Sequence, residues 1–255
     1  MKPKVLVLSG YGLNCEDETK YAFELAGGTG QIVHINDLIK NKNIINNFQI
    51  MAIPGGFAYG DDTGSGNAYG LKLRNHLWED ISKFILKDKL IIGICNGFQV
   101  LVNLGLVPAL NKKYGERQVA LLPNESARYI TGWFDLKVEN DTPWLTGIKK
   151  ISLPIAHGEG KFFASDKILK QINNKNLIAL KYDKVNPTGT IQNIAGITDE
   201  SKKIFGLMPH PERAMFFTQL PNWTYIKEKY LRERKLLPKF GPGLQIFKNG
   251  VNYFK

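Results

Sequence analysis

The residues best suited to chemistry are a cysteine between two glycines, in Gly-Ile-Cys-Asn-Gly at residues 93–97. A hydrophobic run over 90–94 predicts a strand that ends at Cys95, and a helix is expected from 97 to about 104. On so tight a turn, larger side chains at positions −2 and +2 would collide with neighbouring elements. The helix dipole favours the thiolate, and the Asn96 N–H is free to bind an oxyanion. We therefore predict that Cys95 is a nucleophile rather than an inert buried thiol.

A thiol nucleophile needs a base, and the chain contains four histidines. His34 lies in an apolar run and is expected to be a packed residue, and His76 lies on the solvated face of a predicted helix. The remaining two each precede a glutamate that can orient the imidazole: His157 with Glu159, and His210 with Glu212.

The two His–Glu pairs differ in the segments that lead to them. His210 follows an apolar run, 204–208, and the carboxyl ends of parallel strands are where catalytic groups gather. The strand expected before His157 contains a proline and is a weaker prediction. The residues themselves thus favour His210 as the base but leave His157 open.

A second motif, Pro-Gly-Gly-Phe at residues 54–57, follows a predicted strand and precedes a glycine-rich loop at 60–66. Glycine lets the backbone turn an N–H toward a ligand, so the N–H of Gly56 or Phe57 is a candidate second oxyanion donor. The alternatives are a phosphate cradle and an ordinary flexible loop. A cradle is disfavoured because neither a Walker lysine nor a GxGxxG pattern is present.

The rest of the chain predicts the elements that must position these residues. Short apolar strands alternate with helices in the first half, which indicates an α/β fold with a mostly parallel open sheet and helices on both faces. The middle, residues 118–180, is typical of a small antiparallel addition. We interpret 1–255 as a single domain. The expected strands are 4–8, 31–35, 49–53, 90–94, 134–138, 178–182 and 204–208, and the expected helices are 17–26, 68–86, 97–104, 222–235 and a short one after the Gly/Pro loop at 238–243.

Composition limits the class of protein. With 43% hydrophobic and 22% charged residues the chain is typical of a globular protein, and no apolar run reaches the ~20 residues of a membrane span. We therefore expect a cytoplasmic protein without membrane contact. Only two cysteines are present, and no CxxC pattern indicates a metal site. The net charge of +11 is mostly scattered lysine, and no nucleic-acid-binding motif accompanies it.

Taken together, the motifs at 54–57, 93–99 and 209–212 resemble those of the class I glutamine amidotransferases in order and spacing. Within that class, the sequence is most similar to the glutaminase subunits of the phosphoribosylformylglycinamidine synthases of purine biosynthesis. The segments that carry this likeness are Gly-Gly-Phe-Ala-Tyr-Gly-Asp at 55–61, Leu-Pro-Asn-Glu-Ser-Ala-Arg-Tyr at 122–129 and Pro-Ile-Ala-His-Gly-Glu-Gly at 154–160. The resemblance covers residues 4 to about 218 and resumes near 243.

The resemblance implies a flavodoxin-like sheet and a thioester mechanism. Cys95 attacks the glutamine amide, and His210, oriented by Glu212, carries the protons. The backbone at Gly56 or Phe57 and at Asn96 binds the oxyanion. Gln99 helps to hold the glutamine or the loop around it, and His157 lies near the glutamine pocket rather than acting as the base.

The resemblance also implies partners. Ammonia passes to a separate synthetase subunit, which uses ATP and Mg²⁺ to convert formylglycinamide ribonucleotide to the amidine, and a small bridging subunit can join the complex. No cofactor or metal is expected in this chain. The isolated chain is expected to be a weak glutaminase, because free ammonia would be wasted.

The sequence departs from shorter members of the family at residues 61–69 and in an apparent insertion at 220–240. The insertion carries aromatic and basic side chains, which indicates either a partner-docking surface or a helix packed on the chain's own core. Two other functions remain as alternatives. One is a cysteine hydrolase of the same fold, and the other is a silent regulatory or structural subunit. The paired motifs and the intact Cys-His-Glu set argue against both.

Overall fold

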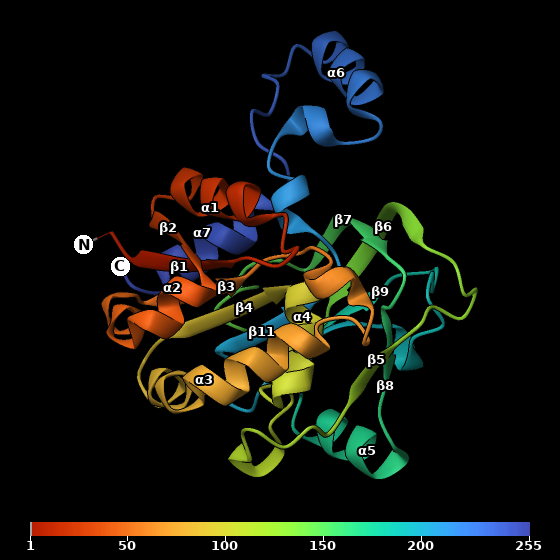
Figure 1. Cartoon of the computed structure of the whole chain (residues 1–255). Coiled ribbons are helices and arrows are strands. Elements are labelled where there is room, and N and C mark those ends of the chain that lie inside the picture. Colours follow the sequence, from red (N-terminus) through yellow and green to blue (C-terminus); the bar gives the residue numbers. More distant parts are fainter. Residues whose placement is uncertain (1) are drawn as a thin grey trace.

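A computed structural model describes residues 2–255, and its main feature is one nine-stranded sheet (Figure 1). Its strands lie in the order β2-β1-β3-β4-β11-β10-β9-β6-β7. The half from β2 to β11 is parallel, and the half from β11 to β7 is antiparallel. The strands are β1 (Lys4–Ser9), β2 (Thr29–His34), β3 (Ile50–Ile53), β4 (Leu90–Ile94), β6 (Ile130–Val138), β7 (Lys150–His157), β9 (Ile178–Tyr182), β10 (Ile194–Thr198) and β11 (Ile204–Leu207), with β5 (Ala120–Leu122) and β8 (Lys161–Phe163) forming a separate small antiparallel sheet.

Helices cover both faces of this sheet, as the alternating pattern predicted. α1 and α7 lie on one face, and α3 and α4 lie on the other (Figure 1). The predicted α/β fold class is therefore confirmed. The helices are α1 (Glu16–Leu25), α2 (Ile35–Lys40), α3 (Asn67–Ile85), α4 (Asn96–Leu104), α5 (Asp166–Asn174), α6 (Trp223–Arg232) and α7 (Leu244–Asn252), with short 3₁₀ turns η1 (Lys42–Asn47), η2 (Ala58–Asp61), η3 (Leu110–Lys112), η4 (Ile191–Asn193), η5 (Pro211–Arg213) and η6 (Phe217–Gln219).

The strands are of two kinds, central and edge, and the burial pattern of each kind explains how clearly the sequence indicated it. β3, β4 and β11 are buried at every position, because a central parallel strand packs helices on both faces. β7 instead alternates between buried and more exposed side chains, as expected of an edge strand. Its place at the sheet edge also explains why Pro154 is tolerated, since one side of the strand needs no ladder hydrogen bond.

The antiparallel half differs from its prediction in extent. Residues 134–138 were expected as a strand, but β6 begins at Ile130 and pairs with β7 along almost its whole length. The first residues of β6 include Gly132 and are only partly buried, so they lack a clear alternating pattern. Pairing with β7 holds them in the sheet.

His34 lies in a strand, as expected, but it is the last residue of β2 and only half-buried. Its Nδ1 accepts a hydrogen bond from the Asn36 N–H (3.2 Å) at the start of α2. Capping of the following helix therefore decides its position. His76 is exposed on α3, as predicted.

An aromatic cluster joins the two ends of the chain. The Phe23 ring of α1 meets the Phe247 ring of α7 edge-on, with centroids 4.9 Å apart, and it also lies edge-on to Trp144. Trp144 is fully buried, and its indole N–H donates to the Lys203 carbonyl (3.1 Å). The cluster seals the sheet face opposite α4.

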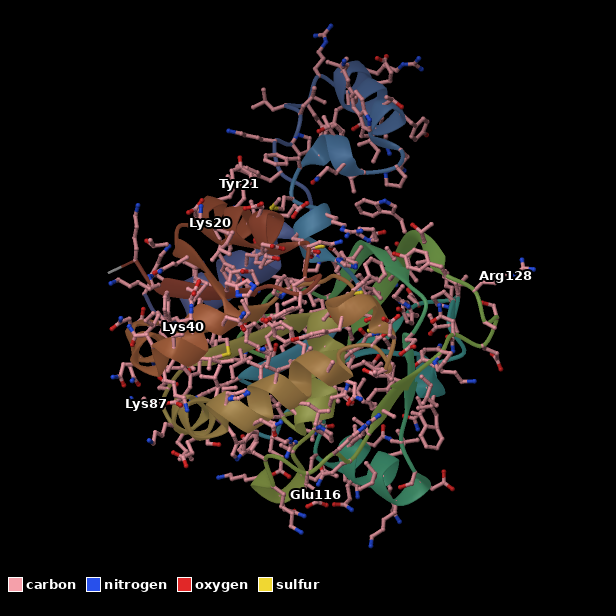
Figure 2. All side chains as sticks on the ribbon, in the orientation of Figure 1. Lys20, Tyr21, Lys40, Lys87, Glu116 and Arg128 are labelled. Atoms are coloured by element: carbon pink, nitrogen blue, oxygen red, sulfur yellow. The ribbon has the colours of Figure 1, made fainter. Side chains whose placement is uncertain are left out.

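The segment at residues 220–240 stands away from the rest of the molecule (Figure 1). The predicted helix is present as α6, but none of its residues is buried, and its side chains extend outward on several sides (Figure 2). The segment is therefore not packed on the chain's own core, which was one of the two interpretations of the insertion. In residues 2–255, no helix combines the length and the apolar character that crossing a bilayer requires.

The closest packing in the fold gives a first prediction. A Cβ on Gly97 would overlap the Ile53 carbonyl of β3, so we expect Gly97→Ala to lower the free energy of unfolding by about 2–3 kcal/mol or more. Urea unfolding measures this change. Gly158→Ala is the matched control, because its Cβ would meet only Tyr129 at 4.0 Å, and it should change stability by less than about 0.5 kcal/mol. Equal losses in both variants would contradict the close-packing argument.

Candidate active site

Three neighbouring strands carry the predicted site residues to one edge of the sheet. β3, β4 and β11 lie side by side and parallel, so their carboxyl ends coincide. Gly55 and Gly56 follow the end of β3, Cys95 follows β4, and His210 lies three residues beyond β11. The chain thus brings together residues that lie far apart in the sequence, at the sheet edge where open α/β folds bind ligands.

Cys95 sits on a strained turn between β4 and α4. Its φ and ψ are 51° and −106°, a combination that L-residues rarely adopt, and its N–H donates to the Leu207 carbonyl of β11 (2.8 Å). A Cβ on Gly93 would lie 2.5 Å from the Gly97 carbonyl oxygen, so the predicted need for small residues at −2 and +2 has a direct structural cause. The turn presents the Cys95 thiol at the first turn of α4.

His210 and Glu212 form a buried pair beside this thiol. The His210 Nδ1 lies 2.5 Å from the Glu212 Oε1, and both side chains are almost fully buried. Burial alone would lower the pKa of His210. The charge of Glu212 and the nearby sulfurs of Cys95 and Cys15 outweigh it and raise that pKa well above its usual value. This shift favours the imidazolium form, and the His210 Nε2 has no hydrogen-bond partner in residues 2–255.

His157 does not form the equivalent pair with Glu159. The Glu159 Oε2 accepts from the Ser65 N–H (3.0 Å), and neither ring nitrogen of His157 has a hydrogen-bond partner among the described residues. Burial, helped by the positive charge of His210, lowers the pKa of His157 to about 3. His157 is consequently neutral at physiological pH and has no carboxylate to orient it, so the geometry favours His210 as the base.

Two backbone N–H groups near Cys95 are free to bind an oxyanion. The Gly56 N–H has no acceptor within residues 2–255, and the Asn96 N–H is at the start of α4, where intrahelical acceptors are lacking. The Phe57 N–H is engaged, because it donates to the Gly12 carbonyl (2.8 Å). Of the two candidates at the glycine motif, Gly56 is therefore the available donor. Phe57 instead places its half-exposed ring 6.1 Å from that of Tyr129.

A cavity of about 220 Å³ opens beside Cys95. Its wall includes Gly56, Phe57, His157 and Gln99, all four of which were predicted to lie near the substrate. The size suits a single amino acid, since one water molecule occupies about 30 Å³. His210 is not part of this wall and approaches Cys95 from another side.

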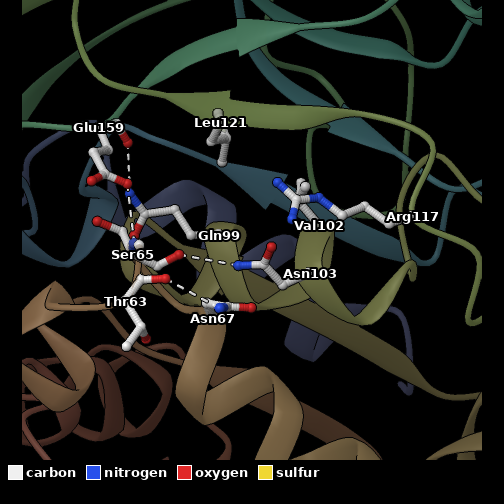
Figure 3. Close-up of a pocket in the computed structure, with 10 residues that line it drawn as sticks. Thr63, Ser65, Asn67, Gln99, Val102, Asn103, Arg117, Leu121 and Glu159 are labelled. Carbon is white, nitrogen blue, oxygen red and sulfur yellow. Dashed lines mark hydrogen bonds between the residues drawn. The ribbon is translucent and has the colours of Figure 1, made fainter.

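Asn96 and Gln99 hold the glycine loop in place. The Asn96 Oδ1 accepts from the Ala58 N–H (3.1 Å), and its Nδ2 donates to the Gln99 Oε1 (2.8 Å). Gln99 in turn donates to the Glu159 carbonyl (2.6 Å). Both polar groups of the Gln99 amide are thus engaged with the surrounding protein. A second, polar cavity of about 150 Å³ lies on the other side of Gln99, next to Asn103 and Arg117 (Figure 3).

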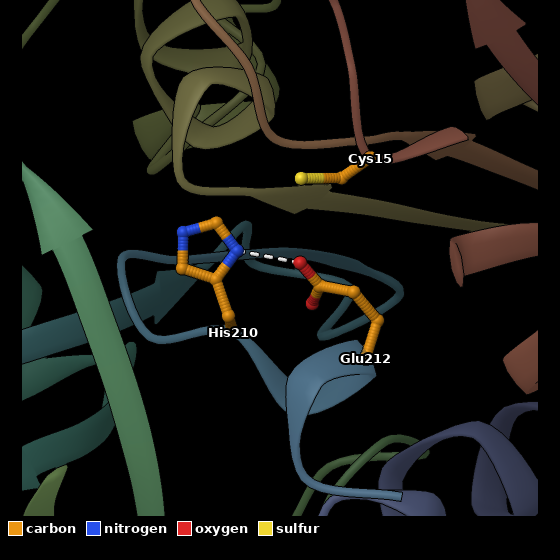
Figure 4. A group of neighbouring side chains, drawn as sticks. All are labelled: Cys15, His210 and Glu212. Carbon is orange, nitrogen blue, oxygen red and sulfur yellow. Dashed lines mark hydrogen bonds and ion pairs between the residues drawn. The ribbon is translucent and has the colours of Figure 1, made fainter. Parts of the chain in front are cut away.

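Sequence reasoning did not identify Cys15 and Arg213 as neighbours of the site. Cys15 is buried at the start of α1, and its sulfur accepts a hydrogen bond from the Arg213 Nη2 (3.0 Å). In Figure 4 its side chain points toward the His210 ring. One feature of the sequence could have identified Cys15: it lies shortly after β1, and β1 neighbours β3 in the sheet.

Cys15, His210 and Glu212 also offer ligand atoms within 4.8 Å of one another, a spacing that a metal ion can bridge. Their contacts do not fit this role. The Nδ1 of His210 and the Oε1 of Glu212 are hydrogen-bonded to each other. The positively charged Arg213 guanidinium donates a hydrogen bond to the Cys15 sulfur. The cluster is better described as a hydrogen-bonded group.

Fold and site together define a cysteine-dependent glutamine amidotransferase architecture. A model of the family described as "CobB/CobQ-like glutamine amidotransferase domain" matches residues 2–254. The chain belongs to this family. Relatives named "Phosphoribosylformylglycinamidine synthase subunit PurQ" include one from Methanococcus maripaludis, 47% identical over 99% of this chain and 97% of its own length, and one from Dehalococcoides mccartyi, 42% identical over 99% and 98%.

Solved structures agree with this placement. A chain in "Structure of PurLQS from Thermotoga maritima" is 31% identical, has a TM-score of 0.75 and is matched over the full length of both chains. A glutamine amidotransferase from Thermotoga maritima, at 14% identity and a TM-score of 0.55, shares the fold over 99% of this chain and 96% of its own. The predicted family resemblance is confirmed.

The buried neutral His157 gives a prediction for acid stability. Its pKa is about 3 when folded and about 6.5 when unfolded, so below pH 6.5 the unfolded chain binds the extra proton and stability falls. Between pH 7.5 and 5.0, this effect lowers the free energy of unfolding by about 2 kcal/mol. We expect His157→Gln to remove this part of the decline in urea unfolding at the two pH values. His76→Gln, at an exposed site, should leave the decline unchanged. An unaltered decline in His157→Gln would contradict the assignment.

Proposed function

We propose that this chain is the glutaminase subunit of a phosphoribosylformylglycinamidine synthase. It hydrolyses glutamine to glutamate and ammonia and delivers the ammonia to a synthetase subunit, in de novo purine biosynthesis. The observation that carries the proposal is the meeting of Cys95 with the His210–Glu212 pair at the ends of neighbouring strands, in a chain whose full-length relatives bear that name.

The reaction begins at the Cys95 thiolate, with the His210 imidazolium as its counterion. Cys95 attacks the side-chain amide carbon of glutamine, and the N–H groups of Gly56 and Asn96 stabilise the resulting oxyanion. The His210 imidazolium then gives its proton to the departing nitrogen, and ammonia leaves behind a glutamyl thioester. The raised pKa of His210 suits this first step, because the acid is charged before glutamine binds.

Hydrolysis of the thioester reverses the proton transfer. The now neutral His210 takes a proton from water, the hydroxide attacks the thioester carbonyl, and glutamate and the thiolate are released. Glu212 holds the imidazole by its Nδ1 throughout and stabilises its charged form. The chain itself contributes no nucleotide chemistry. ATP and Mg²⁺ act in the synthetase subunit, and a small bridging subunit completes the complex.

The proposal is tested by labelling with a diazo-ketone analogue of glutamine, followed by intact mass and peptide mapping. We expect one adduct on Cys95, which excess glutamine prevents and which Cys95→Ala abolishes. The labelling is repeated with the synthetase subunit and formylglycinamide ribonucleotide, because the free chain is expected to be weakly active. Absence of an adduct under both conditions would overturn the glutaminase assignment and favour a silent subunit.

Substitution of Glu212 tests the role assigned to the His210–Glu212 pair. Glu212→Gln should lower kcat for glutamine hydrolysis by about 10³- to 10⁴-fold with little change in KM, because the imidazolium loses its charged partner. His76→Asn is the control. It changes an exposed histidine of α3 that lines neither cavity, and it should retain full activity. A Glu212→Gln enzyme with more than about a tenth of the wild-type kcat would contradict the role assigned to the pair.

Cys15 is expected to act as a positioning residue for His210. Cys15→Ala removes the acceptor for Arg213, and a hydrogen bond to a charged group is worth about 1.5–3 kcal/mol, so kcat should fall at least about tenfold. Because Cys15 helps to raise the pKa of His210, the alkaline limb of the kcat/KM profile should also move to lower pH. Cys15→Ser keeps an acceptor and should preserve most activity. If the alkaline limb of the kcat/KM profile does not move in Cys15→Ala, Cys15 contributes only packing and does not influence the pKa of His210.

A further inference from the structure

The segment at residues 220–240, here called the arm, is joined to the body of the molecule at its base. Phe216 and Phe240 form an isolated antiparallel bridge where the arm leaves and rejoins the body. Their rings lie 6.2 Å apart, and the Lys248 ammonium of α7 sits over the Phe240 ring at 5.1 Å. Beyond this base the only aromatic contact to a neighbouring element is between Tyr230 and Phe217 of η6, among the described residues.

The helix of the arm lacks the packing that ordinarily stabilises a helix of its length. α6 has ten residues, and isolated helices shorter than about 12–15 residues are marginal in water. None of its residues is buried, and Tyr225 is 71% exposed. Three leucines of the arm are also exposed, and the most exposed of them, Leu236, reaches 94%; the other two are Leu231 and Leu237. A surface of this kind is expected to gain its packing from another molecule.

The chemistry of the arm indicates what that molecule offers. Residues 220–240 contain six Lys or Arg and two Glu, a net charge of +4. A groove along one side of α6 is lined by the Tyr225 ring and by both charge signs, with Lys229 and Arg232 beside Glu228 and Glu233, so the excess positive charge belongs to the arm as a whole. The arm thus exposes apolar side chains together with a net positive charge, which suits a protein surface that combines carboxylates with apolar side chains. A phosphate backbone would satisfy the cations but leave the leucines in water.

The base of the arm is close to the catalytic group. η5 carries Glu212 and Arg213, and Phe216 follows only a few residues later. The Met215 carbonyl accepts from the Gly241 N–H (2.7 Å), which ties the returning end of the arm to the same segment. A protein held by the arm is consequently held next to the site that releases ammonia.

From these contacts we propose that the arm docks onto an acidic, partly apolar surface of the synthetase subunit and keeps that subunit beside the glutaminase site. The inference rests on the proposed function, because that function supplies the partner. Steering by the arm's positive charge raises the rate of association, and the exposed leucines and Tyr225 slow dissociation once the surfaces meet.

The experiment compares two charge reversals in the full-length chain. The arm variant is Lys229→Glu, Arg232→Glu and Arg234→Glu, three exposed cations that form no ion pair among the described residues. The body variant is Lys42→Glu, Lys83→Glu and Lys87→Glu, which are also exposed and form no ion pair within residues 2–255. Both variants change the net charge equally, so only the location of the charge differs.

Binding of each chain to the synthetase subunit is measured at low and high salt by surface plasmon resonance. We expect the arm variant to raise Kd at least about tenfold at low salt, mainly through slower association, and to weaken the salt dependence. The body variant should stay within about twofold of wild type. Covalent labelling of Cys95 by the glutamine analogue should be equal in all three chains, which shows that the site remains folded.

Other outcomes overturn the proposal. Equal weakening by both variants would indicate general electrostatics, and no weakening by either would exclude the arm from the interface. The same arm variant is tested for binding to RNA, to anionic vesicles and to a second copy of the chain. Loss of one of these interactions with unchanged synthetase affinity would assign the arm to that partner instead. A chain that binds the synthetase through the arm but never reacts with the glutamine analogue would refute the proposed function and leave the arm's role intact.

Discussion

Helix α4 approaches β3 so closely that only glycine fits at residue 97, where a Cβ would overlap the Ile53 carbonyl. This contact sets the position of the turn that carries Cys95, directly before Asn96 at the start of α4. Because β3 also supplies Gly56, the same contact fixes the spacing between the thiol and both candidate oxyanion donors. Strain at Cys95 is maintained by the packing on either side of it.

A hydrogen-bonded group of charged side chains lies beside this turn. The buried Glu212 and the imidazolium of His210 neutralise each other, and Arg213 reaches the Cys15 sulfur at the edge of the group. Breaking a buried pair of this kind leaves an uncompensated charge, which is strongly unfavourable. His157, close to His210, is held neutral by its surroundings, so it adds no second positive charge beside that of His210.

The sequence by itself determined the parallel half of the fold and the identity of the triad candidates. Buried parallel strands are continuous apolar runs, so β1, β3, β4 and β11 could be recognised without any neighbour. The glycines around Cys95 report a backbone requirement that is local to the turn. The spacing of His210 and Glu212 is likewise local, and for this reason the pair could be found from the sequence.

Only the tertiary structure decided features that depend on distant contacts. The choice between Gly56 and Phe57 as donor rests on the Gly12 carbonyl, and the neutrality of His157 follows from burial by other segments. Cys15 joined the site because β1 lies beside β3, an adjacency that no sequence period encodes. From its composition alone, the arm could be either a helix packed on the chain's own core or a docking surface for a partner. Its separation from the core was a property of the assembled chain, because burial is decided by what lies opposite a side chain and not by the side chain itself.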